Sequence, residues 1–230
     1  AGTTNKVLAK IASLTLTAYP DSLEGGVTVG NPVRDEIIAL PEPRVRYEAR
    51  EGQLKVLVVG GSLGALAINE ILPQVLGQLD SVPCPQVWHQ TGRAHVEKTK
   101  ELYERYGLNA RVDPFIEDMA EALAWADLLV SRAGALTISE IAAAGVASVL
   151  IPYPHAIDDH QTANAQWLVS HGAAVMLRQQ DMTETTLKTL LSQLLMNRSH
   201  LQSMACLARE KAMLDAVRLV SKYCEEVVND

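Results

Sequence analysis

A glycine-rich stretch that follows an apolar run is the strongest chemical feature of the sequence. Residues 54–59 read Leu-Lys-Val-Leu-Val-Val, and residues 60–65 read Gly-Gly-Ser-Leu-Gly-Ala before an amphipathic segment begins. Glycines at a strand-to-helix turn let the backbone approach a ligand, and the first N–H groups of the helix lack partners. The loop therefore favours a phosphate or diphosphate ligand, with Gly61, Ser62 and Gly64 as candidate contacts. A tight turn without a ligand is the alternative.

Two other nucleotide-binding loops fit this stretch less well. A dinucleotide site favours Gly-x-Gly-x-x-Gly and an acidic residue at the end of the second strand. Here the second strand ends Trp88-His89-Gln90, without an acid. A P-loop is excluded because no Gly-Lys-Ser/Thr follows the strand.

A serine hydrolase is an alternative, because residues 60–64 match the Gly-x-Ser-x-Gly of a nucleophile elbow. The residues that could complete a triad with Ser62 are Asp158, Asp159, His160 and His171. An elbow normally follows several strands that supply the oxyanion hole, whereas only one short strand precedes this loop. This order of elements disfavours the hydrolase.

A second loop of small residues occupies residues 131–139, with Glu140 next. A strand ends and a helix begins there, so a second set of unpaired N–H groups is expected at the same sheet edge. Thr137 and Glu140 share one helix face. The Glu140 carboxylate could accept hydrogen bonds from both hydroxyls of a ribose. It could equally be a favourable charge at the positive end of the helix.

Polar side chains also gather in residues 152–164, after the fifth expected strand. Gln161 and Asn164 lie about one helical turn apart and suit a hydroxyl-rich ligand such as a sugar. His155, Asp158 and His160 match no standard metal-ligand spacing, so no metal is predicted.

The elements that must position these loops alternate regularly between strand and helix. Strands are expected at 54–59, near Val87, near Val112, and at 128–130, 149–151 and near Val175. Helices are expected at 68–79, 95–106, 118–125, 136–144 and 160–170. This order predicts an α/β fold with a Rossmann-like, doubly wound parallel sheet over residues 54–176. The loops described above then share the carboxyl edge of the sheet, where ligands bind.

The first 51 residues do not follow this alternation. One helical face is formed by Val7, Ile11, Leu14 and Ala18, which predicts a helix ending at residues 20–21. A short strand is expected at 27–29, and Arg34 near the start of a helix. Residues 41–51, proline-containing and then charged, are predicted to be a linker. Because the chain begins at Ala1, without Met or a signal segment, we expect a piece of a longer protein.

Composition narrows the function classes. The 230 residues are 48% hydrophobic but only 4% aromatic, as suits a core of Ala, Val, Ile and Leu in a parallel sheet. The net charge of −7 disfavours nucleic acid as the main partner. The three cysteines lack metal-ligand spacing and are expected to be reduced thiols in the cytoplasm.

The ordered set of motifs resembles the C-terminal half of the MurG family of peptidoglycan glycosyltransferases. The stretches that carry the resemblance are residues 1–6, 30–34, 58–65, 88–92, 115–119, 132–140 and 154–164. The resemblance implies a GT-B fold, in which two Rossmann-like domains face each other across a cleft. It implies that residues 1–30 are the end of the N-terminal acceptor domain and that residues 31–212 bind the UDP-sugar donor. Residues 213–230 would form a helix that packs back on the N-terminal domain.

The resemblance also implies roles for individual residues. Arg34 would lie beside the nucleotide, Ser62 and its loop would hold the diphosphate, and Glu140 would bind the ribose. Phe115 and Ile116 would present backbone groups to uracil. The complete set of implied substrate-binding residues is Arg34, Gly61, Ser62, Gly64, Phe115, Ile116, Ala135, Leu136, Thr137, Ile138, Ser139, Glu140, His160, Gln161 and Asn164. Leu63 stands where many relatives have Gln, which removes one polar side chain from the loop.

The activity implied is an inverting transfer of N-acetylglucosamine from UDP-N-acetylglucosamine to lipid I, which forms lipid II in peptidoglycan synthesis. No cofactor or metal is implied, and the catalytic base would belong to the N-terminal domain, so the fragment alone is expected to be inactive. The family acts at the cytoplasmic face of the bacterial inner membrane as a peripheral protein, in cell-wall biogenesis, cell shape and cell division. A non-catalytic module that binds a UDP-sugar is a further alternative.

Overall fold

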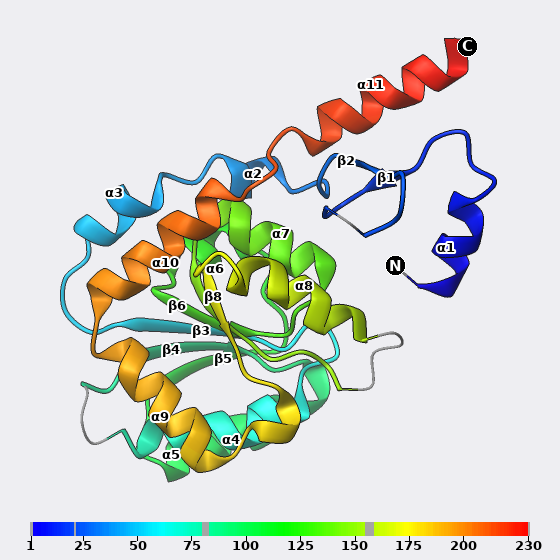
Figure 1. Cartoon of the computed structure of the whole chain (residues 1–230). Coiled ribbons are helices and arrows are strands. Elements are labelled where there is room, and N and C mark those ends of the chain that lie inside the picture. Colours follow the sequence, from blue (N-terminus) through cyan, green and yellow to red (C-terminus); the bar gives the residue numbers. More distant parts are fainter. Residues whose placement is uncertain (1, 21, 80–82, 155–158, 230) are drawn as a thin grey trace.

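A six-stranded parallel sheet forms the body of the protein in the computed structural model, which describes residues 2–20, 22–79, 83–154 and 159–229 (Figure 1). The strands, in chain order, are β3 (Lys55–Val59), β4 (Gln86–Gln90), β5 (Ala110–Asp113), β6 (Leu128–Ser131), β7 (Ala147–Leu150) and β8 (Ala174–Met176). Their spatial order is β5-β4-β3-β6-β7-β8, with every neighbouring pair parallel. The predicted doubly wound α/β fold is confirmed.

Helices cover both faces of this sheet. One face carries α4 (Leu66–Gly77), α5 (Val96–Arg105, after a short 3-10 turn, Arg93–His95) and α9 (Glu184–Leu195). The other carries α6 (Met119–Trp125), α7 (Ala135–Ala144) and α8 (His160–Val169). A second 3-10 turn, Gln179–Asp181, precedes α9, and α10 (Arg198–Glu210) packs on β7 and α7. The chain thus forms three layers, helix, sheet and helix (Figure 1).

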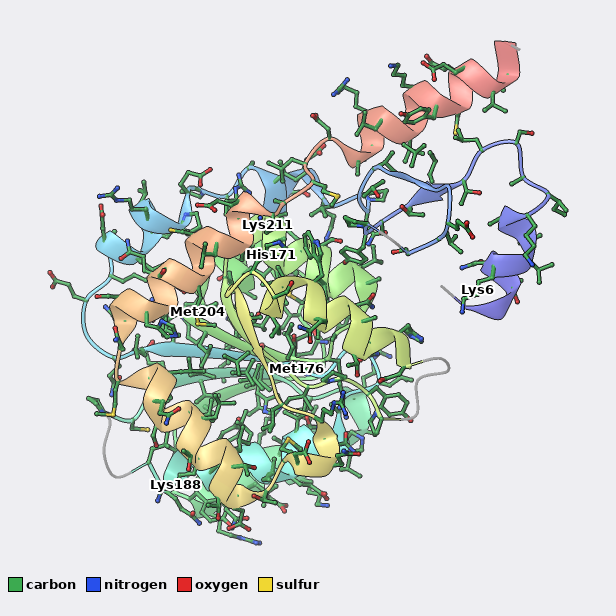
Figure 2. All side chains as sticks on the ribbon, viewed as in Figure 1. Lys6, His171, Met176, Lys188, Met204 and Lys211 are labelled. Carbon is green, nitrogen blue, oxygen red and sulfur yellow. The ribbon has the colours of Figure 1, made fainter. Side chains whose placement is uncertain are left out.

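The core follows from the alternation of side chains along buried strands. Val56 and Val58 of β3 contact one layer of helices, whereas Leu57 between them contacts the other. Because both faces are covered, the strand is a continuous apolar run, as the sequence indicated. Met204 of α10 is buried in the core on the same side of the sheet as Val56 and Val58 (Figure 2).

The predicted linker at residues 41–51 is wrong. Pro43–Glu48 form helix α3, preceded by the short helix α2 (Asp35–Ile38). Arg46 donates to the carbonyls of Leu123, Ala144 and Gly145. Arg46 and Arg50, two of the charges that suggested a solvated linker, instead bind backbone groups of the body and hold this segment in place.

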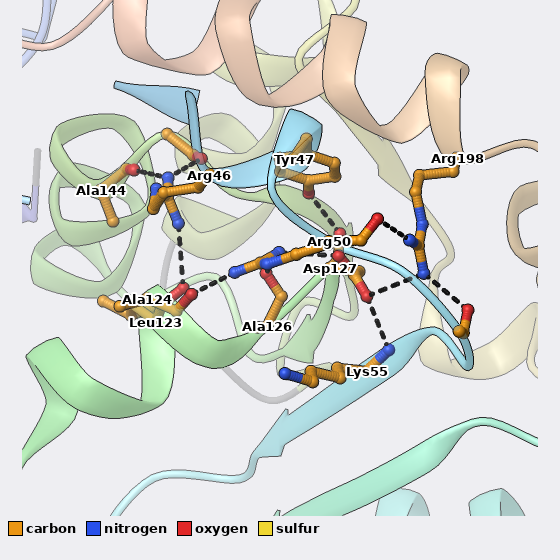
Figure 3. A network of polar contacts seen from close by, with 12 residues as sticks. Arg46, Tyr47, Arg50, Lys55, Leu123, Ala124, Ala126, Asp127, Ala144 and Arg198 are labelled. Atoms are coloured by element: carbon orange, nitrogen blue, oxygen red, sulfur yellow. Dashed lines mark hydrogen bonds and ion pairs between the residues drawn. The ribbon is translucent and has the colours of Figure 1, made fainter. Parts of the chain in front are cut away.

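An acidic residue at the amino edge of the sheet completes this anchorage (Figure 3). Asp127 is 1% exposed, and its carboxylate accepts from Arg50 Nη1 at 2.7 Å and from the Lys55 N–H at 2.8 Å. Arg198 Nη2 lies 3.9 Å from the same carboxylate, and Tyr47 donates its hydroxyl to the Asp127 carbonyl. The cluster joins α3, β3, β6 and α10 at the edge opposite to the glycine loop.

The helix predicted over residues 7–18 is also wrong. Helix α1 covers Thr3–Ala9, and Leu16–Thr17 form a short strand, β1, that pairs with β2 (Val27–Thr28). The apolar residues had suggested one helix, but the backbone of Thr15 and Thr17 instead bonds to residues 27–30. Ile11, expected on the helix face, is 80% exposed.

The last helix, α11 (Ala216–Asn229), extends away from the body on the side where α1 also lies (Figures 1 and 2). Val217 and Val228 of this helix are exposed. The segment that leaves β2 and the segment that leads to α11 come close together at Gly30, whose added Cβ would lie 2.6 Å from Met213 Cβ. Among the described residues, no helix is long and apolar enough to cross a membrane.

Candidate functional site

The carboxyl ends of β3 and β6 open onto a cavity of about 590 Å³. These neighbouring strands lie at the point where the strand order reverses, which is where doubly wound sheets bind ligands. The cavity is lined by residues 59–67 and by Arg132, Gly134, Thr137, Tyr153, Gln161 and Gln179. The two predicted anion loops therefore meet at one cavity.

The glycine loop, residues 60–65, reaches the cavity in a conformation that requires glycine. Gly61 and Gly64 have φ values of 84° and 80°, in the left-handed region. A Cβ on Gly64 would lie 2.9 Å from the Thr91 carbonyl carbon and closer still to its oxygen. Ala65 precedes α4 without a side-chain cap, so the first N–H groups of α4 remain for a ligand.

Helix α7 brings a second uncapped N-terminus to the same cavity. Its N-cap, Gly134, has no side chain, and Thr137 of the first turn lines the cavity. Ala135 and Leu136, predicted to offer N–H groups, lie in this first turn. Ile138 is fully buried in the core and donates its N–H to the Gly134 carbonyl, so the structure places it in packing. Two helix dipoles thus favour a negative charge between them.

Arg132 adds a fixed positive charge to this wall of the cavity. Its Nη1 donates to the Ile151 and Pro152 carbonyls at 3.2 and 3.3 Å, and its Nη2 to Gln179 Oε1 at 2.6 Å. The guanidinium also lies 5.5 Å from the centre of the Tyr153 ring. Burial lowers the pKa of Arg132, but an arginine remains charged at neutral pH. The sequence analysis assigned no role to Arg132, although this residue lies within the second anion loop.

Gln161 of α8 has its amide orientation set by the backbone. Its Oε1 accepts from the N–H groups of Ala133 at 3.2 Å and Tyr153 at 2.9 Å. The Gln161 NH2 group is therefore the part that can donate to a ligand in the cavity. Asn164 donates to the Ala133 carbonyl at 3.1 Å, beneath the same loop. These contacts leave the Gln161 NH2 group at the cavity, whereas the Asn164 amide donates within the protein.

His160 and Asn164 line a different cavity, of about 710 Å³, that reaches the N-terminal segment. Most of its wall comes from residues 4–5, 16–19 and 22–23, and Ala135 borders it as well. The predicted site residues on α8 are thus divided, with Gln161 on the first cavity and His160 on the second.

Glu140 lies one turn into α7 and pairs with the other predicted charged residue. Arg34 Nη2 donates to Glu140 Oε1 at 2.8 Å, and the Glu140 side chain is only 23% exposed. The N-cap residue of α2 is Arg34, as its position before a helix predicted. The structure brings these two candidate residues together, so one arginine orients the carboxylate.

Ser139 binds another part of the chain. Its hydroxyl lies 3.0 Å from Tyr19 Oη and accepts from Asn31 Nδ2 at 3.1 Å. Tyr19 also donates to the Ala135 carbonyl at 2.5 Å, and burial raises the pKa of Tyr19 to about 12. The structure thus places Ser139 in a contact that holds the N-terminal segment against α7.

Phe115 and Ile116 follow β5, beside the end of β4. Phe115 is half-exposed, whereas Ile116 is buried and donates its N–H to Gln90 Oε1 at 2.9 Å. A cavity of about 320 Å³ begins next to them and is lined by Arg34, Glu36, Ile37 and residues 117–120. The Ile116 N–H, one of the backbone groups predicted to face a base, is already bonded within the protein.

The residues proposed for other chemistries are not gathered around Ser62. His171 bonds to the Trp167 carbonyl at the end of α8, and Asp159 accepts from Thr162. His155 and Asp158, named for a metal or a triad, lie outside the described residues. In the described part of the chain, no three His, Cys, Asp or Glu side chains are grouped to hold a metal ion. The geometry gives the hydrolase interpretation no support.

Comparison with known proteins identifies the family of the chain. Residues 55–220 match the glycosyltransferase family 28 C-terminal domain. Over the whole chain, 49% of residues are identical to a Saccharophagus degradans protein named UDP-N-acetylglucosamine–N-acetylmuramyl-(pentapeptide) pyrophosphoryl-undecaprenol N-acetylglucosamine transferase. A Cellvibrio japonicus protein of the same name is 52% identical over 235 residues. The chain spans 59% and 65% of these two relatives.

Solved structures agree with these relatives. The crystal structure of Acinetobacter baumannii MurG superposes with a TM-score of 0.90 at 42% identity, over 98% of this chain and 64% of that one. A kitacinnamycin glycosyltransferase, at 21% identity and a TM-score of 0.61, shares the fold. The predicted GT-B type of fold and the predicted family are therefore confirmed.

Proposed function

Because the chain belongs to glycosyltransferase family 28, we propose that it is the donor-binding part of an inverting UDP-N-acetylglucosamine-dependent transferase. The acceptor would be lipid I and the product lipid II, as the relatives' names indicate. The observation that carries the proposal is the convergence of two uncapped helix N-termini on one cavity, with the Gln161 NH2 group beside it. This arrangement suits a diphosphate attached to a sugar.

The proposed mechanism divides the work between two domains. An acceptor hydroxyl attacks the anomeric carbon of the donor sugar, the bond to UDP breaks, and the configuration inverts. A base must take the hydroxyl proton, and the departing UDP must be stabilised. In this chain the N-termini of α4 and α7, with Arg132, supply positive potential for the departing diphosphate. We assign no catalytic base to these residues.

The site residues have matching roles in the proposal. Gly61, Ser62 and Gly64 hold the diphosphate together with the first turn of α7, and Gln161 donates to sugar hydroxyls. Glu140, oriented by Arg34, accepts from the ribose hydroxyls. Phe115 and Ile116 border the base, near the smaller cavity that Arg34 also lines.

The domain assignment is part of the same proposal. Residues 31–212 form the donor domain, residues 1–30 are the end of an acceptor domain, and residues 213–230 pack back on that domain. The exposed apolar side chains of α1 and α11, among them Val7 and Val228, support it, since exposed apolar patches mark interaction sites. Peripheral membrane contact would belong mainly to the acceptor domain. The whole enzyme would act at the cytoplasmic face of the inner membrane, in cell-wall growth, cell shape and cell division.

Calorimetry with two nucleotide sugars tests the donor assignment. The chain is expected to bind UDP-N-acetylglucosamine and UDP, and to bind GDP-mannose at least about tenfold more weakly, since the wrong base leaves buried polar groups unpaired. Equal binding of both sugars, or of neither, would contradict the proposal. Transfer to lipid I by this chain alone would show that the acceptor domain is dispensable.

A further inference from the structure

The side chain of Gln90, at the end of β4, joins two loops of the proposed donor site. It is 2% exposed. Its Nε2 donates to the Gly61 carbonyl at 3.0 Å, and its Oε1 accepts from the Ile116 N–H at 2.9 Å. One end of the amide therefore contacts the glycine loop, and the other contacts the loop that carries Phe115 and Ile116.

An uncharged amide of this length can make two hydrogen bonds of opposite direction at once. Gly61 offers an acceptor and Ile116 a donor, so the joining group must donate at one end and accept at the other. A carboxylate cannot donate, and an apolar side chain would leave the buried Ile116 N–H unpaired and the Gly61 carbonyl with only the Gly64 N–H, at 3.1 Å. The sequence drew attention to this position because it lacks the acid of a dinucleotide site, yet the structure shows two hydrogen bonds made by the amide.

The backbone beside Gln90 contacts the same two loops. The Thr91 N–H donates to the Asp113 carbonyl at 3.1 Å, where the loop that carries Phe115 and Ile116 begins. Gly64 packs against the Thr91 carbonyl, as described above, and Gly92 packs against Leu63 and Gly64. The end of β4 thus supports both loops, and the Gln90 side chain connects them.

Hydrogen bonds among buried polar side chains fix the end of β4 from the interior of the protein. Asn69 donates to the Thr91 carbonyl at 2.9 Å, and its Oδ1 lies 3.0 Å from His89 Nε2. His89 Nδ1 lies 2.9 Å from the Tyr103 hydroxyl. Because all these groups are buried, the end of β4 has little freedom to move, and the position of Gln90 is set by the core.

We propose that Gln90 is a positioning residue that sets the spacing between the diphosphate-binding and base-binding loops. The inference rests on the proposed function, in which the glycine loop holds the diphosphate and the loop of Phe115 holds the uracil. A ligand that spans both loops gains affinity when their spacing is fixed in advance. A ligand that contacts one loop gains little, because that loop alone can adjust to it.

Fragments of the donor distinguish a positioning role of Gln90 from a general contribution to stability. Affinities of UDP, uridine and inorganic pyrophosphate are measured for the full chain and for the Gln90→Leu variant. UDP is expected to bind at least about tenfold more weakly to the variant, while uridine and pyrophosphate change by less than about threefold. Gln90→Met, which keeps the length of the side chain and removes both hydrogen bonds without adding a charge, is expected to show the same selectivity for the joined ligand and guards against misfolding of the first variant.

Tyr47→Phe is the matched control, because it also removes one buried hydrogen bond to a backbone carbonyl, but at the opposite edge of the sheet. It should lower the melting temperature and leave all three affinities unchanged. Equal losses for the three ligands, or an unchanged or tighter UDP affinity in both Gln90 variants, would overturn the inference alone. Absence of UDP binding by the unaltered chain would overturn the proposed function, and this inference with it.

Discussion

Replacing Gly64 by alanine tests whether the glycine loop is as rigid as its contacts indicate. Gly64 has a φ of 80°, and an added Cβ would overlap the Thr91 carbonyl group. Thr91 cannot easily retreat, because Asn69 holds its carbonyl and Asp113 accepts its N–H. The substitution should therefore strain both the loop and the end of β4.

The expected cost has two parts. An L-residue in the left-handed region costs roughly 1–2 kcal/mol. Forcing an extra carbon into a well-packed region costs about 1–3 kcal/mol more. We expect Gly64→Ala to lower the free energy of unfolding by about 2–5 kcal/mol, a large share of the roughly 5–15 kcal/mol of a typical domain.

The Gly61→Ala variant separates the cost of the backbone conformation from the cost of the steric overlap. Gly61 has nearly the same φ, 84°, but an added Cβ there would meet no atom within 4 Å. This variant should lose only the conformational part, about 1–2 kcal/mol. The difference between the two variants then measures the overlap with Thr91.

Urea denaturation of both variants, followed by circular dichroism, gives the two free energies of unfolding. UDP affinity should fall for Gly64→Ala, because the first turn of α4 would shift relative to α7. Equal stability of the two variants would refute the reasoning, since it would show that the loop moves away from Thr91 without cost.

Three further predictions concern charge. Glu140→Ala should weaken UDP binding by about 1–3 kcal/mol in calorimetry, since ribose hydroxyls lose a partly buried acceptor; unchanged affinity would remove Glu140 from the site. Asp127→Ala should lower the free energy of unfolding by about 3–5 kcal/mol by leaving Arg50 without its partner, with UDP affinity unchanged, whereas Asp215→Ala, which breaks an exposed pair, should cost less than about 1 kcal/mol. Burial lowers the pKa of His89 to about 3, so the unfolded chain binds more protons below its ordinary pKa of about 6.5. Stability should therefore fall as the pH falls from 7.5 to 5, more steeply than in His89→Gln; parallel pH profiles in denaturation experiments would contradict this.

The alternation of strands and helices could be predicted because its causes are local. Buried strands such as Lys55–Val59 are short apolar runs, and the glycines that end them mark the turns. The convergence of the two anion loops followed from the parallel sheet alone, since the carboxyl ends of its strands share one edge. These parts of the site needed no knowledge of distant contacts.

The mistaken or missing parts depend on contacts between distant residues. Arg46 looked like part of a solvated linker, but it binds the carbonyl of Leu123, 77 residues away. Ser139 faces Tyr19, 120 residues earlier in the chain. The sequence drew attention to Gln90 only because a dinucleotide site would have an acidic residue there. No local pattern encodes such pairings, because the partners become neighbours only when the sheet assembles.

The close approach of Gly30 and Met213 has a mechanical consequence. The segment that leaves β2 and the segment that leads to α11 come close together at this contact. Gly30 has a φ of 88°, and the contact leaves no room for a side chain there. A larger residue at position 30 would have to push Met213 aside, and with it the start of α11. The placement of the last helix beside β2 therefore depends on the absence of a side chain at this one position.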